Sequence, residues 1–370
     1  MRIVLAGGGT GGHLTPLIAV AKKLREKLGS DAEMLYIGSG APMEEQFIAP
    51  EGIPMRRVVS GKIRRYFSLD NVVDFFKFPI GIVQSLWLLL WYMPDVVFSK
   101  GGYASVPVVI AAWCYRIPVI LHESDAVPGT ANKILGKLAD DVVLAYAHAE
   151  SYFESARTAI YGIPVREGVV GGDLSSGRTM FHLTESRPTV LVLGGSQGAR
   201  VINQSVIRSL PSLLHRTQII HQTGEAEYSD VVRMAGEYGI KAGHDGYTPL
   251  AFLNQEQQRN AFAAADLVIS RAGATSIAEI AANGKATILI PLQNSANDHQ
   301  RMNAYEIAKI GGALVLEETN LGQDILIEKV DKILNDNELR ATMGEKIKVF
   351  YHPQAAEKIT DGIIRLANGE

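Results

Sequence analysis

The sequence predicts an α/β fold made of two Rossmann-like domains, each built on a parallel sheet, that face each other across a cleft. Short apolar segments alternate with helical patterns along the chain, which is typical of parallel strands joined by helices. A strand, a glycine-rich turn and a helix open the sequence, and the same succession begins again at residue 189. The 370 residues, of which 47% are hydrophobic, are sufficient for more than one core.

The first domain begins with the apolar segment 2–6, which the turn Gly7–Gly12 and His13 connect to a helix. We expect this helix to begin near Leu14–Pro16 and to reach Leu28. Further strands of the first domain are expected at residues 33–38, 55–59, 95–99, 118–121 and 141–144.

The second domain begins with the apolar segment 189–193, which Gly194–Ala199 connects to another helix. Glycines and a proline interrupt the pattern within residues 162–172, so we predict domains 1–165 and 166–350. Further strands of the second domain are expected at residues 217–221, 266–270 and 286–290.

The charge and the cysteine content exclude several classes of function. A formal net charge of −3 provides no positive excess for binding nucleic acid. Cys114 is the single cysteine, which excludes an internal disulfide and a zinc site made of cysteines. It lies in an apolar run, so we expect a buried thiol. No basic and apolar leader precedes the first strand, and we therefore expect a cytoplasmic location.

The apolar and aromatic segment 75–92 has two interpretations. It is shorter than the roughly 20 residues that span a bilayer. One interpretation is a buried helix beside a solvated basic loop. The other is an apolar face that lies on an anionic membrane. We favour a membrane surface formed by residues 56–92, because a group of cations precedes the aromatic residues: Arg56, Arg57, Lys62, Arg64 and Arg65.

The glycine-rich turns indicate phosphate binding, since such a turn points backbone N–H groups and the positive end of a helix dipole at one spot. The first turn matches the dinucleotide pattern, but the second strand ends in Tyr36-Ile37-Gly38 and lacks the acidic residue that holds a ribose. An oxidoreductase is therefore disfavoured.

A serine hydrolase is a second alternative, because Gly194-x-Ser196-x-Gly198 matches the nucleophile elbow, and Asp298 and His299 follow. That interpretation leaves His13 and the whole first domain without a role. Two phosphate-binding turns instead favour a transfer between a nucleotide-sugar donor and a phosphate-bearing acceptor.

A series of motifs resembles the GT-B enzymes of glycosyltransferase family 28 over essentially the whole chain. The motifs occur in the family's order: Gly8–His13, Gly101–Tyr103 with Ser105 and Pro107, His122-Glu123, Pro128-Gly129 with Asn132, Pro164–Arg166, Gly194–Ala199, Arg271 with Gly273-Ala274, Glu279, and Asp298–Gln300 with Asn303-Ala304.

The resemblance implies an inverting transfer of N-acetylglucosamine from UDP-N-acetylglucosamine to lipid I, the undecaprenyl-diphosphate-linked muramyl pentapeptide, without a cofactor. The product is lipid II, used in peptidoglycan synthesis. The resemblance also implies that domain 1–165 binds the acceptor and docks on the cytoplasmic face of the cell membrane, that domain 166–350 binds the UDP-sugar, and that a helix at 355–367 packs back on the first domain. Another lipid acceptor, such as diacylglycerol, and a non-catalytic GT-B protein are the alternatives.

In the acceptor domain, His13 is the candidate base, since histidine titrates near neutral pH. Asp125 is a second candidate, because Ser124-Asp125 stands where the family commonly has Gln-Asn; the alternative role of Asp125 is to cap a helix. The family pattern also differs at Ile163, where an asparagine is common. Residues that resemble the family's acceptor contacts are Thr10, Gly11, Gly12, Gly102, Tyr103 and Asn132.

In the donor domain, Arg166 is a candidate cation for the diphosphate, and Glu279 resembles the family's ribose ligand. Leu253 resembles the residue whose backbone meets uracil, although the loop 254–258 looks longer than the family's. Further candidates are Ser196 and Gln197 in the phosphate turn, Ala274, Thr275 and Ser276 at a helix start, and Gln293 and Gln300 for the sugar hydroxyls. Simple N-capping is the alternative for Thr275 and Ser276.

No metal site is expected, because the nine histidines are scattered and no Asp-x-Asp stands in a suitable loop. Backbone dipoles and Arg166 can offset the charge of a diphosphate. We therefore predict a metal-independent reaction. A loosely held Mg²⁺ ion that accompanies UDP is compatible with this prediction.

Overall fold

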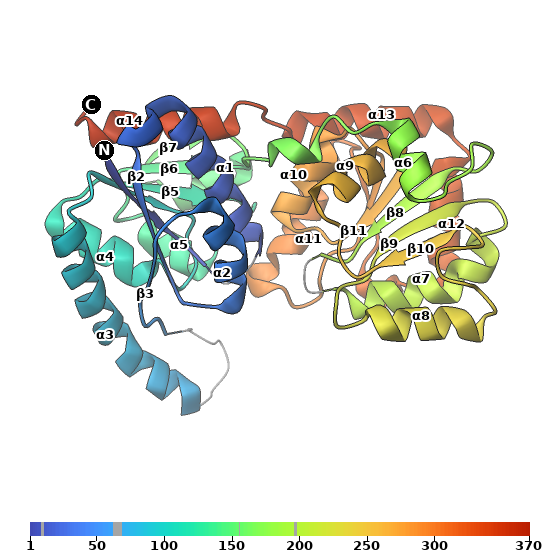
Figure 1. The fold of residues 1–370 in the computed structure, drawn as a ribbon, viewed down its shortest axis with the longest axis horizontal. Coiled ribbons are helices and arrows are strands. Elements are labelled where there is room, and N and C mark those ends of the chain that lie inside the picture. Colours follow the sequence, from blue (N-terminus) through green and yellow to red (C-terminus); the bar gives the residue numbers. More distant parts are fainter. Residues whose placement is uncertain (9–10, 62–68, 155, 196–197) are drawn as a thin grey trace. The chain divides into compact units, whose positions relative to one another are not determined.

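The computed structural model describes residues 1–8, 11–61, 69–154, 156–195 and 198–370, and only the backbone of residues 69–76. The chain forms two compact units (Figure 1). Unit 1 comprises Met1–Val165 and His352–Glu370, and unit 2 comprises Arg166–Tyr351. Both units have a parallel sheet covered by helices, as the sequence predicts.

Unit 1 contains a seven-stranded parallel sheet with the order β3-β2-β1-β4-β5-β6-β7. Its strands are β1 (Arg2–Ala6), β2 (Glu33–Gly38), β3 (Met55–Arg57), β4 (Val96–Ser99), β5 (Val119–Glu123), β6 (Asp141–Leu144) and β7 (Arg157–Ile160). Its helices are α1 (Gly11–Leu28), α2 (Pro42–Ile48), α3 (Leu69–Tyr92), α4 (Val106–Tyr115), α5 (Thr130–Leu135) and α14 (Ala355–Ala367).

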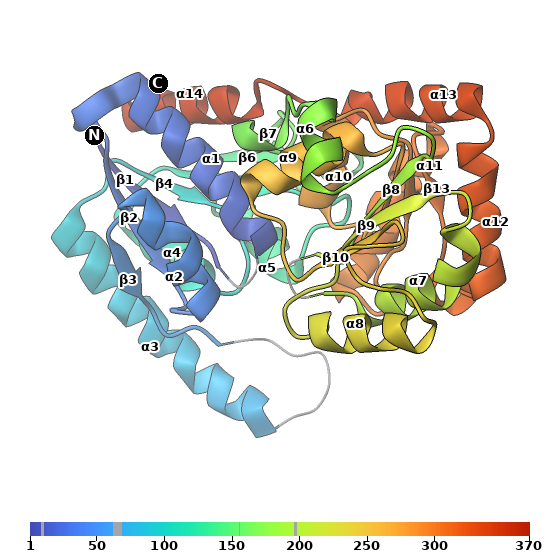
Figure 2. The same cartoon turned by 45° about the vertical axis from the view of Figure 1, so that its right-hand side comes forward.

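Both faces of this sheet are covered, so its strands are apolar on both sides. In β1, Ile3 and Leu5 belong to the core beneath α1 and α14, whereas Val4 and Ala6 belong to the core beneath α3 and α4. The last helix, α14, lies beside α1 in both views of the ribbon (Figures 1 and 2). Lys27 of α1 lies 2.6 Å from Asp361 of α14, so an ion pair adds to this apolar contact.

Unit 2 contains a six-stranded parallel sheet with the order β10-β9-β8-β11-β12-β13. Its strands are β8 (Thr189–Leu193), β9 (Gln218–Gln222), β10 (Tyr247–Leu250), β11 (Leu267–Ser270), β12 (Thr287–Leu289) and β13 (Leu314–Val315). Its helices are α6 (Leu174–Met180), α7 (Arg200–Leu213), α8 (Tyr228–Glu237), α9 (Gln255–Ala264), α10 (Ala274–Ala282), α11 (His299–Lys309), α12 (Gln323–Leu334) and α13 (Asn337–Ile347).

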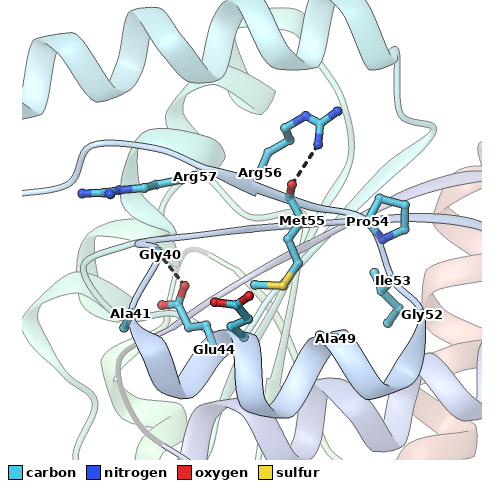
Figure 3. Close-up of a pocket in the computed structure, with 11 residues that line it drawn as sticks. Gly40, Ala41, Glu44, Ala49, Gly52, Ile53, Pro54, Met55, Arg56 and Arg57 are labelled. Atoms are coloured by element: carbon cyan, nitrogen blue, oxygen red, sulfur yellow. Dashed lines mark hydrogen bonds between the residues drawn. The ribbon is translucent and has the colours of Figure 1, made fainter.

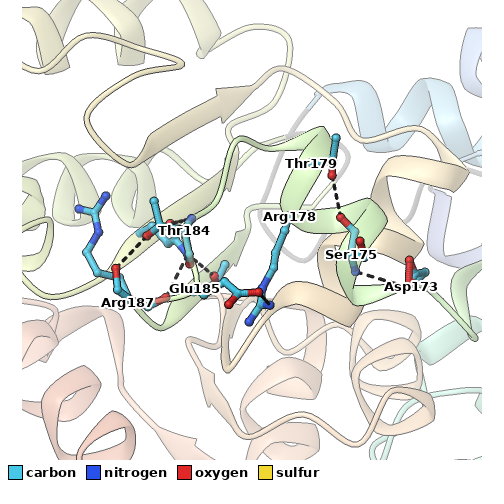
Figure 4. A network of polar contacts seen from close by, with 10 residues as sticks. Asp173, Ser175, Arg178, Thr179, Thr184, Glu185 and Arg187 are labelled. Carbon is cyan, nitrogen blue, oxygen red and sulfur yellow. Dashed lines mark hydrogen bonds and ion pairs between the residues drawn. The ribbon is translucent and has the colours of Figure 1, made fainter.

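A polar network connects α6 to the segment that enters β8 (Figure 4). Asp173 caps α6 by accepting hydrogen bonds from the backbone N–H groups of Ser175 and Ser176. Arg178 lies 2.6 Å from Glu185 in an ion pair. The capped helix and this pair order the entry to the strand that carries the second glycine-rich turn.

Two local expectations are wrong. Cys114 is exposed, because the apolar face of α4 that enters the core ends at Ala112 and the last turn of the helix lies at the surface. Helix α1 begins at Gly11, earlier than expected, because its first turn is glycine-rich and carries no apolar signal. The sequence pattern also failed to identify β7, β10 and β13.

Candidate functional site

In each sheet the strand numbers descend toward one strand and then rise again. This switch point lies between β1 and β4 in unit 1 and between β8 and β11 in unit 2. Ligands of open α/β sheets bind beyond the carboxyl ends of the strands at such a point. The segments that follow these four strands are the predicted motifs: the turn 7–12, Lys100–Tyr103, Gly194–Ala199 and Arg271–Ser276. The fold therefore brings motifs from distant parts of the sequence to neighbouring strand ends.

His13 lies in the first turn of α1 and is half-buried. Its Nδ1 atom lies 2.9 Å from the carbonyl oxygen of Gly8. A carbonyl only accepts hydrogen bonds, so Nδ1 carries a proton, and in the neutral ring the lone pair then lies on Nε2. Gly102 packs against the ring, since a Cβ atom at residue 102 would stand 3.5 Å from Nδ1 and Cε1. The predicted base and the Gly101-Gly102 turn thus adjoin each other.

Asn132 holds this turn in place. Its Oδ1 atom accepts a hydrogen bond of 3.2 Å from the backbone of Gly102, and its Nδ2 atom donates one of 2.9 Å to Glu123. Gly101 and Gly102 have φ values of +82° and +81°, and a Cβ atom at Gly101 would overlap the Asn132 amide. Glycine is required here by both conformation and space. The structure therefore gives Asn132 an ordering role, and its contact with substrate stays a prediction.

Two buried ionisable residues, Lys100 and Glu123, lie next to this turn. The sequence assigned a candidate role only to their half-buried neighbour Asp125. Lys100 is 1% exposed, and its Nζ atom lies 2.9 Å from the hydroxyl of Ser124. Glu123 is 2% exposed and accepts a hydrogen bond of 2.8 Å from the backbone of Asp125. Burial, and then the charge of Asp125, raise the pKa of Glu123 to about 7. Burial lowers the pKa of Lys100.

The turn after β1 is supported by two side chains that carry no motif signal. The hydroxyl of Tyr36 donates a hydrogen bond of 2.9 Å to the carbonyl of Gly7. Glu44 is 1% exposed and accepts hydrogen bonds from the Ser39 hydroxyl and the Gly40 backbone. A Cβ atom at Gly8 would overlap the Glu44 carboxylate, which explains the glycine.

In unit 2, the predicted cation and the predicted ribose ligand form one group. Arg166 donates hydrogen bonds of 3.0 Å to Glu279 and 2.9 Å to Gln258. Gln258 in turn donates a hydrogen bond of 2.8 Å to the other oxygen of Glu279. Glu279 is 6% exposed, and the pairing compensates its buried charge. The sequence did not indicate Gln258, because its place in the group depends on a hydrogen bond between α9 and α10 that has no local sequence signal.

Helix α10 begins at Ala274, and its N-cap residue is Gly273, which has no side chain. The alternative in which Thr275 or Ser276 is the capping residue is therefore wrong; both belong to the first helical turn and are half-buried. The backbone of this turn follows β11 at the switch point. Its positive dipole end suits an anion such as a diphosphate.

The loop before α11 has an unusual backbone. Asn294, Asn297 and Asp298 have φ values of +66°, +56° and +56°, a conformation that non-glycine residues rarely adopt and that clusters at functional sites. The side-chain oxygen of Gln300 accepts a hydrogen bond of 3.0 Å from the backbone of Leu292. The exposed Gln293 is held through its backbone, which donates a hydrogen bond of 2.9 Å to Glu318.

Leu253 is 1% exposed and lies between β10 and α9. The expectation that residues 254–258 form a loop is wrong. Asn254 caps α9 in a capping box with Gln257, and the segment is helical from Gln255 onward. The polar composition resembled a loop, but an asparagine followed three residues later by a glutamine is also a helix start.

The structure describes the remaining predicted contacts in part. Gly11 and Gly12 form the first turn of α1, and Tyr103 is half-buried. Thr10, Ser196 and Gln197 lie outside the described residues. Among the residues that are described, no group of three or more acidic, histidine or cysteine side chains could hold a metal ion.

A separate pocket of about 560 Å³ lies between α2 and β3 (Figure 3). Glu44, Glu45, Met55, Arg56 and Arg57 contribute to its lining. It contains none of the predicted substrate contacts.

Helix α3 exposes apolar side chains at helical spacing, with exposed fractions from 53% to 66%; they are Ile80, Val83, Trp87, Leu90 and Trp91. We call these five residues the α3 face. Its opposite side, with Leu88 and Leu89, is buried against the core. Neither α3 nor any other helix in the described part of the chain has the length and hydropathy needed to span a membrane.

Comparison with known proteins identifies the family to which the chain is similar. The models for the N-terminal and C-terminal domains of glycosyltransferase family 28 match residues 3–144 and 189–359. Two curated relatives are named UDP-N-acetylglucosamine--N-acetylmuramyl-(pentapeptide) pyrophosphoryl-undecaprenol N-acetylglucosamine transferase. The one from Thermodesulfovibrio yellowstonii is 38% identical over 98% of this chain and 97% of its own length. The one from Legionella pneumophila is 38% identical over 96% of this chain and 94% of its own length.

A solved structure agrees with these relatives. Acinetobacter baumannii MurG superimposes with a TM-score of 0.77 at 25% identity, over 98% of this chain and 99% of that one. The chain therefore belongs to glycosyltransferase family 28, within its MurG group.

Proposed function

We propose that this protein is an inverting glycosyltransferase that moves N-acetylglucosamine from UDP-N-acetylglucosamine to lipid I and so forms lipid II for peptidoglycan. The position of His13 carries the proposal. This histidine lies at the switch point of the first sheet, and the Gly8 carbonyl favours the tautomer with the proton on Nδ1. The chain that holds it is related over nearly its full length to transferases named for this reaction. We assign the acceptor to unit 1 and the donor to unit 2.

In an inverting transfer, the acceptor hydroxyl attacks the anomeric carbon from the face opposite UDP. The Nε2 atom of His13 accepts the hydroxyl proton while the oxygen forms the new glycosidic bond. The bond between the anomeric carbon and the diphosphate oxygen breaks, and UDP leaves with the electron pair. The tautomer favoured by the Gly8 carbonyl is the one that this step requires. Asp125 is the second candidate for the same role.

On the donor side, Glu279 is the proposed ribose ligand. Each carboxylate oxygen has two lone pairs, so the oxygens that hold Arg166 and Gln258 can also accept the two ribose hydroxyls. The first turn of α10 faces the diphosphate in this proposal, and its backbone dipole offsets the charge of the leaving group. Gln293 and Gln300 are the proposed contacts to the sugar hydroxyls.

We further propose that the protein binds the cytoplasmic face of the cell membrane through residues 56–92. The α3 face is apolar and aromatic, and the exposed Arg56 and Arg57 lie on the same unit. Such a surface inserts shallowly among anionic lipids. The lipid tail of the acceptor stays in the bilayer, so docking there brings the enzyme to its substrate.

Release of UDP from UDP-N-acetylglucosamine, measured with a soluble lipid I analogue, tests the function. We expect turnover by the wild type and a loss of about 10²- to 10⁴-fold in kcat for His13→Ala, because the base is removed. UDP binding by calorimetry remains unchanged in this variant, since His13 belongs to unit 1. Unchanged turnover in His13→Ala transfers the role of base to Asp125, and turnover with diacylglycerol but not lipid I supports the alternative acceptor.

A further inference from the structure

Lys100 is a lysine that the fold buries almost completely. It follows β4 directly and is 1% exposed, and its Nζ atom lies 2.9 Å from the Ser124 hydroxyl. A buried ammonium group is unfavourable unless other charges compensate it. The carboxylates of Glu123 and Asp125 compensate part of this cost: burial lowers the pKa of Lys100, and both carboxylates act in the opposite direction.

The hydrogen-bond partners of Glu123 favour its ionised form. Its Oε1 atom accepts a hydrogen bond of 2.8 Å from the backbone N–H of Asp125, and its Oε2 atom accepts one of 2.9 Å from Nδ2 of Asn132. A protonated carboxyl group has to donate from one of its oxygens. Both facing groups are donors, so protonation of Glu123 replaces a carboxylate acceptor with a weaker hydroxyl acceptor and weakens one of these two hydrogen bonds.

The consequence of that break extends to the proposed acceptor site. Asn132 uses its Oδ1 atom to hold the backbone of Gly102, and Gly102 packs against the ring of His13. The orientation of the Asn132 amide that serves both partners is held most firmly while the ionised Glu123 accepts its Nδ2 hydrogen. The charge of Glu123 therefore orders the turn beside the proposed base.

The groups around Glu123 act in opposite directions. Burial and Asp125 raise its pKa to about 7, while Lys100, at the end of β4, lowers it, as do the hydrogen bonds from Asp125 and Asn132. His122 precedes it in β5, and burial lowers the pKa of this histidine well below 6.5, so it stays neutral. Lys100 is thus the cation that opposes protonation of Glu123 at neutral pH.

We propose that Lys100 is a positioning residue of the acceptor site, whose buried ammonium group, anchored on Ser124, keeps Glu123 in the ionised form that orders Asn132 and Gly102 beside His13. This inference rests on the proposed acceptor role of unit 1 and deepens it. It also gives a reason for Ser124-Asp125, since Lys100 binds the first of these residues and balances the charge of the second.

A titration of the free protein tests the charge effect without any substrate. In protein labelled with ¹³C at the glutamate side-chain carboxyl, the Glu123 signal is the one that Glu123→Gln removes. We expect a midpoint of about 7 in the wild type. Loss of the cation in Lys100→Met should raise the midpoint of the Glu123 signal by roughly one to two pH units. Lys100→Arg keeps the wild-type midpoint, and Ser124→Ala raises it by less. An unchanged midpoint in Lys100→Met overturns the proposal, and if that variant does not fold, an unchanged midpoint in Ser124→Ala does so.

Steady-state kinetics test the link to the acceptor. At pH 7, Lys100→Met should raise KM for the lipid I analogue about tenfold, because little Glu123 remains ionised, and the effect should disappear at higher pH. KM for UDP-N-acetylglucosamine should stay unchanged. A loss that is independent of pH, or one shared equally by both KM values, indicates a merely structural lysine and contradicts the proposal. If the wild type transfers nothing to lipid I, the proposed function fails, while the titration still decides the role of Lys100.

Discussion

Arg166, Gln258 and Glu279 form the residue-scale feature on which the proposed donor site depends. Arg166 is the first residue of unit 2, and its partners Gln258 and Glu279 lie in α9 and α10. Arg166 and Gln258 fix the orientation of the Glu279 carboxylate, which in the proposed function receives the ribose. Pre-organisation of this kind reduces the entropy cost of binding.

Replacement of the carboxylate measures this contribution. We expect Glu279→Gln to weaken UDP binding about 10- to 100-fold, because a neutral amide cannot accept both ribose hydroxyls and loses the ion pair with Arg166. Isothermal titration calorimetry with UDP checks the effect. Glu328→Gln is the matched control, since this α12 glutamate is 65% exposed and should leave affinity unchanged. Equal affinity in Glu279→Gln and the wild type would remove Glu279 from the ribose site.

At this scale, motif residues were predictable and their supporting partners were not. His13, Arg166 and Glu279 stand in recognisable patterns, and the structure places them at or near the switch points. Lys100 and Gln258 act through contacts with residues that are distant in sequence. Such contacts depend on which strands and helices lie next to each other in the fold, and a single sequence carries no local signal for them.

Among the elements, helix α3 combines two apolar sides that serve different purposes. Leu88 and Leu89 enter the core beside α4, while the α3 face is exposed. Exposed apolar residues in a continuous stripe mark an interaction site. One side of this segment is buried, as the first sequence interpretation expects, and the exposed side has the apolar composition on which the second interpretation, a membrane surface, is based.

Charge on the α3 face should abolish membrane binding. We expect Trp87→Glu combined with Trp91→Glu to reduce co-sedimentation with anionic vesicles at least about tenfold, because both indoles lose their apolar contact with lipid and the added charges are repelled. Turnover of a soluble lipid I analogue should persist. Tyr238→Glu combined with Val349→Glu is the matched control, as both residues are exposed on unit 2. Vesicle binding that is equal in the two double variants contradicts the proposed surface.

The strands that the sequence pattern missed share one property: β7, β10 and β13 all lie at an edge of their sheet. An edge strand is covered on fewer sides and needs fewer apolar residues. In β10, Pro249 also removes a backbone donor, which an edge position tolerates. The central strands, such as β1 and β8, are buried along their length and were therefore predictable.

For the molecule as a whole, the chain leaves unit 1 after Val165 and returns to it at His352. The apolar side of α14, with Ile359 and Ile363, completes the core that α1 begins. Unit 1 therefore needs both ends of the chain, while unit 2 is continuous in sequence. The two sheets resemble each other in that each has a glycine-rich turn and a second loop after the strands at its switch point.

The central claim is that these two units together transfer one sugar with inversion to a lipid-linked diphosphate. The most direct measurement is the structure of the product formed by the purified protein from UDP-N-acetylglucosamine and a short-chain lipid I analogue. We predict a mass increase of a single N-acetylglucosamine residue, release of one UDP per product, and a β linkage in the proton NMR spectrum. An α linkage, or no sugar added to the analogue, would contradict the account.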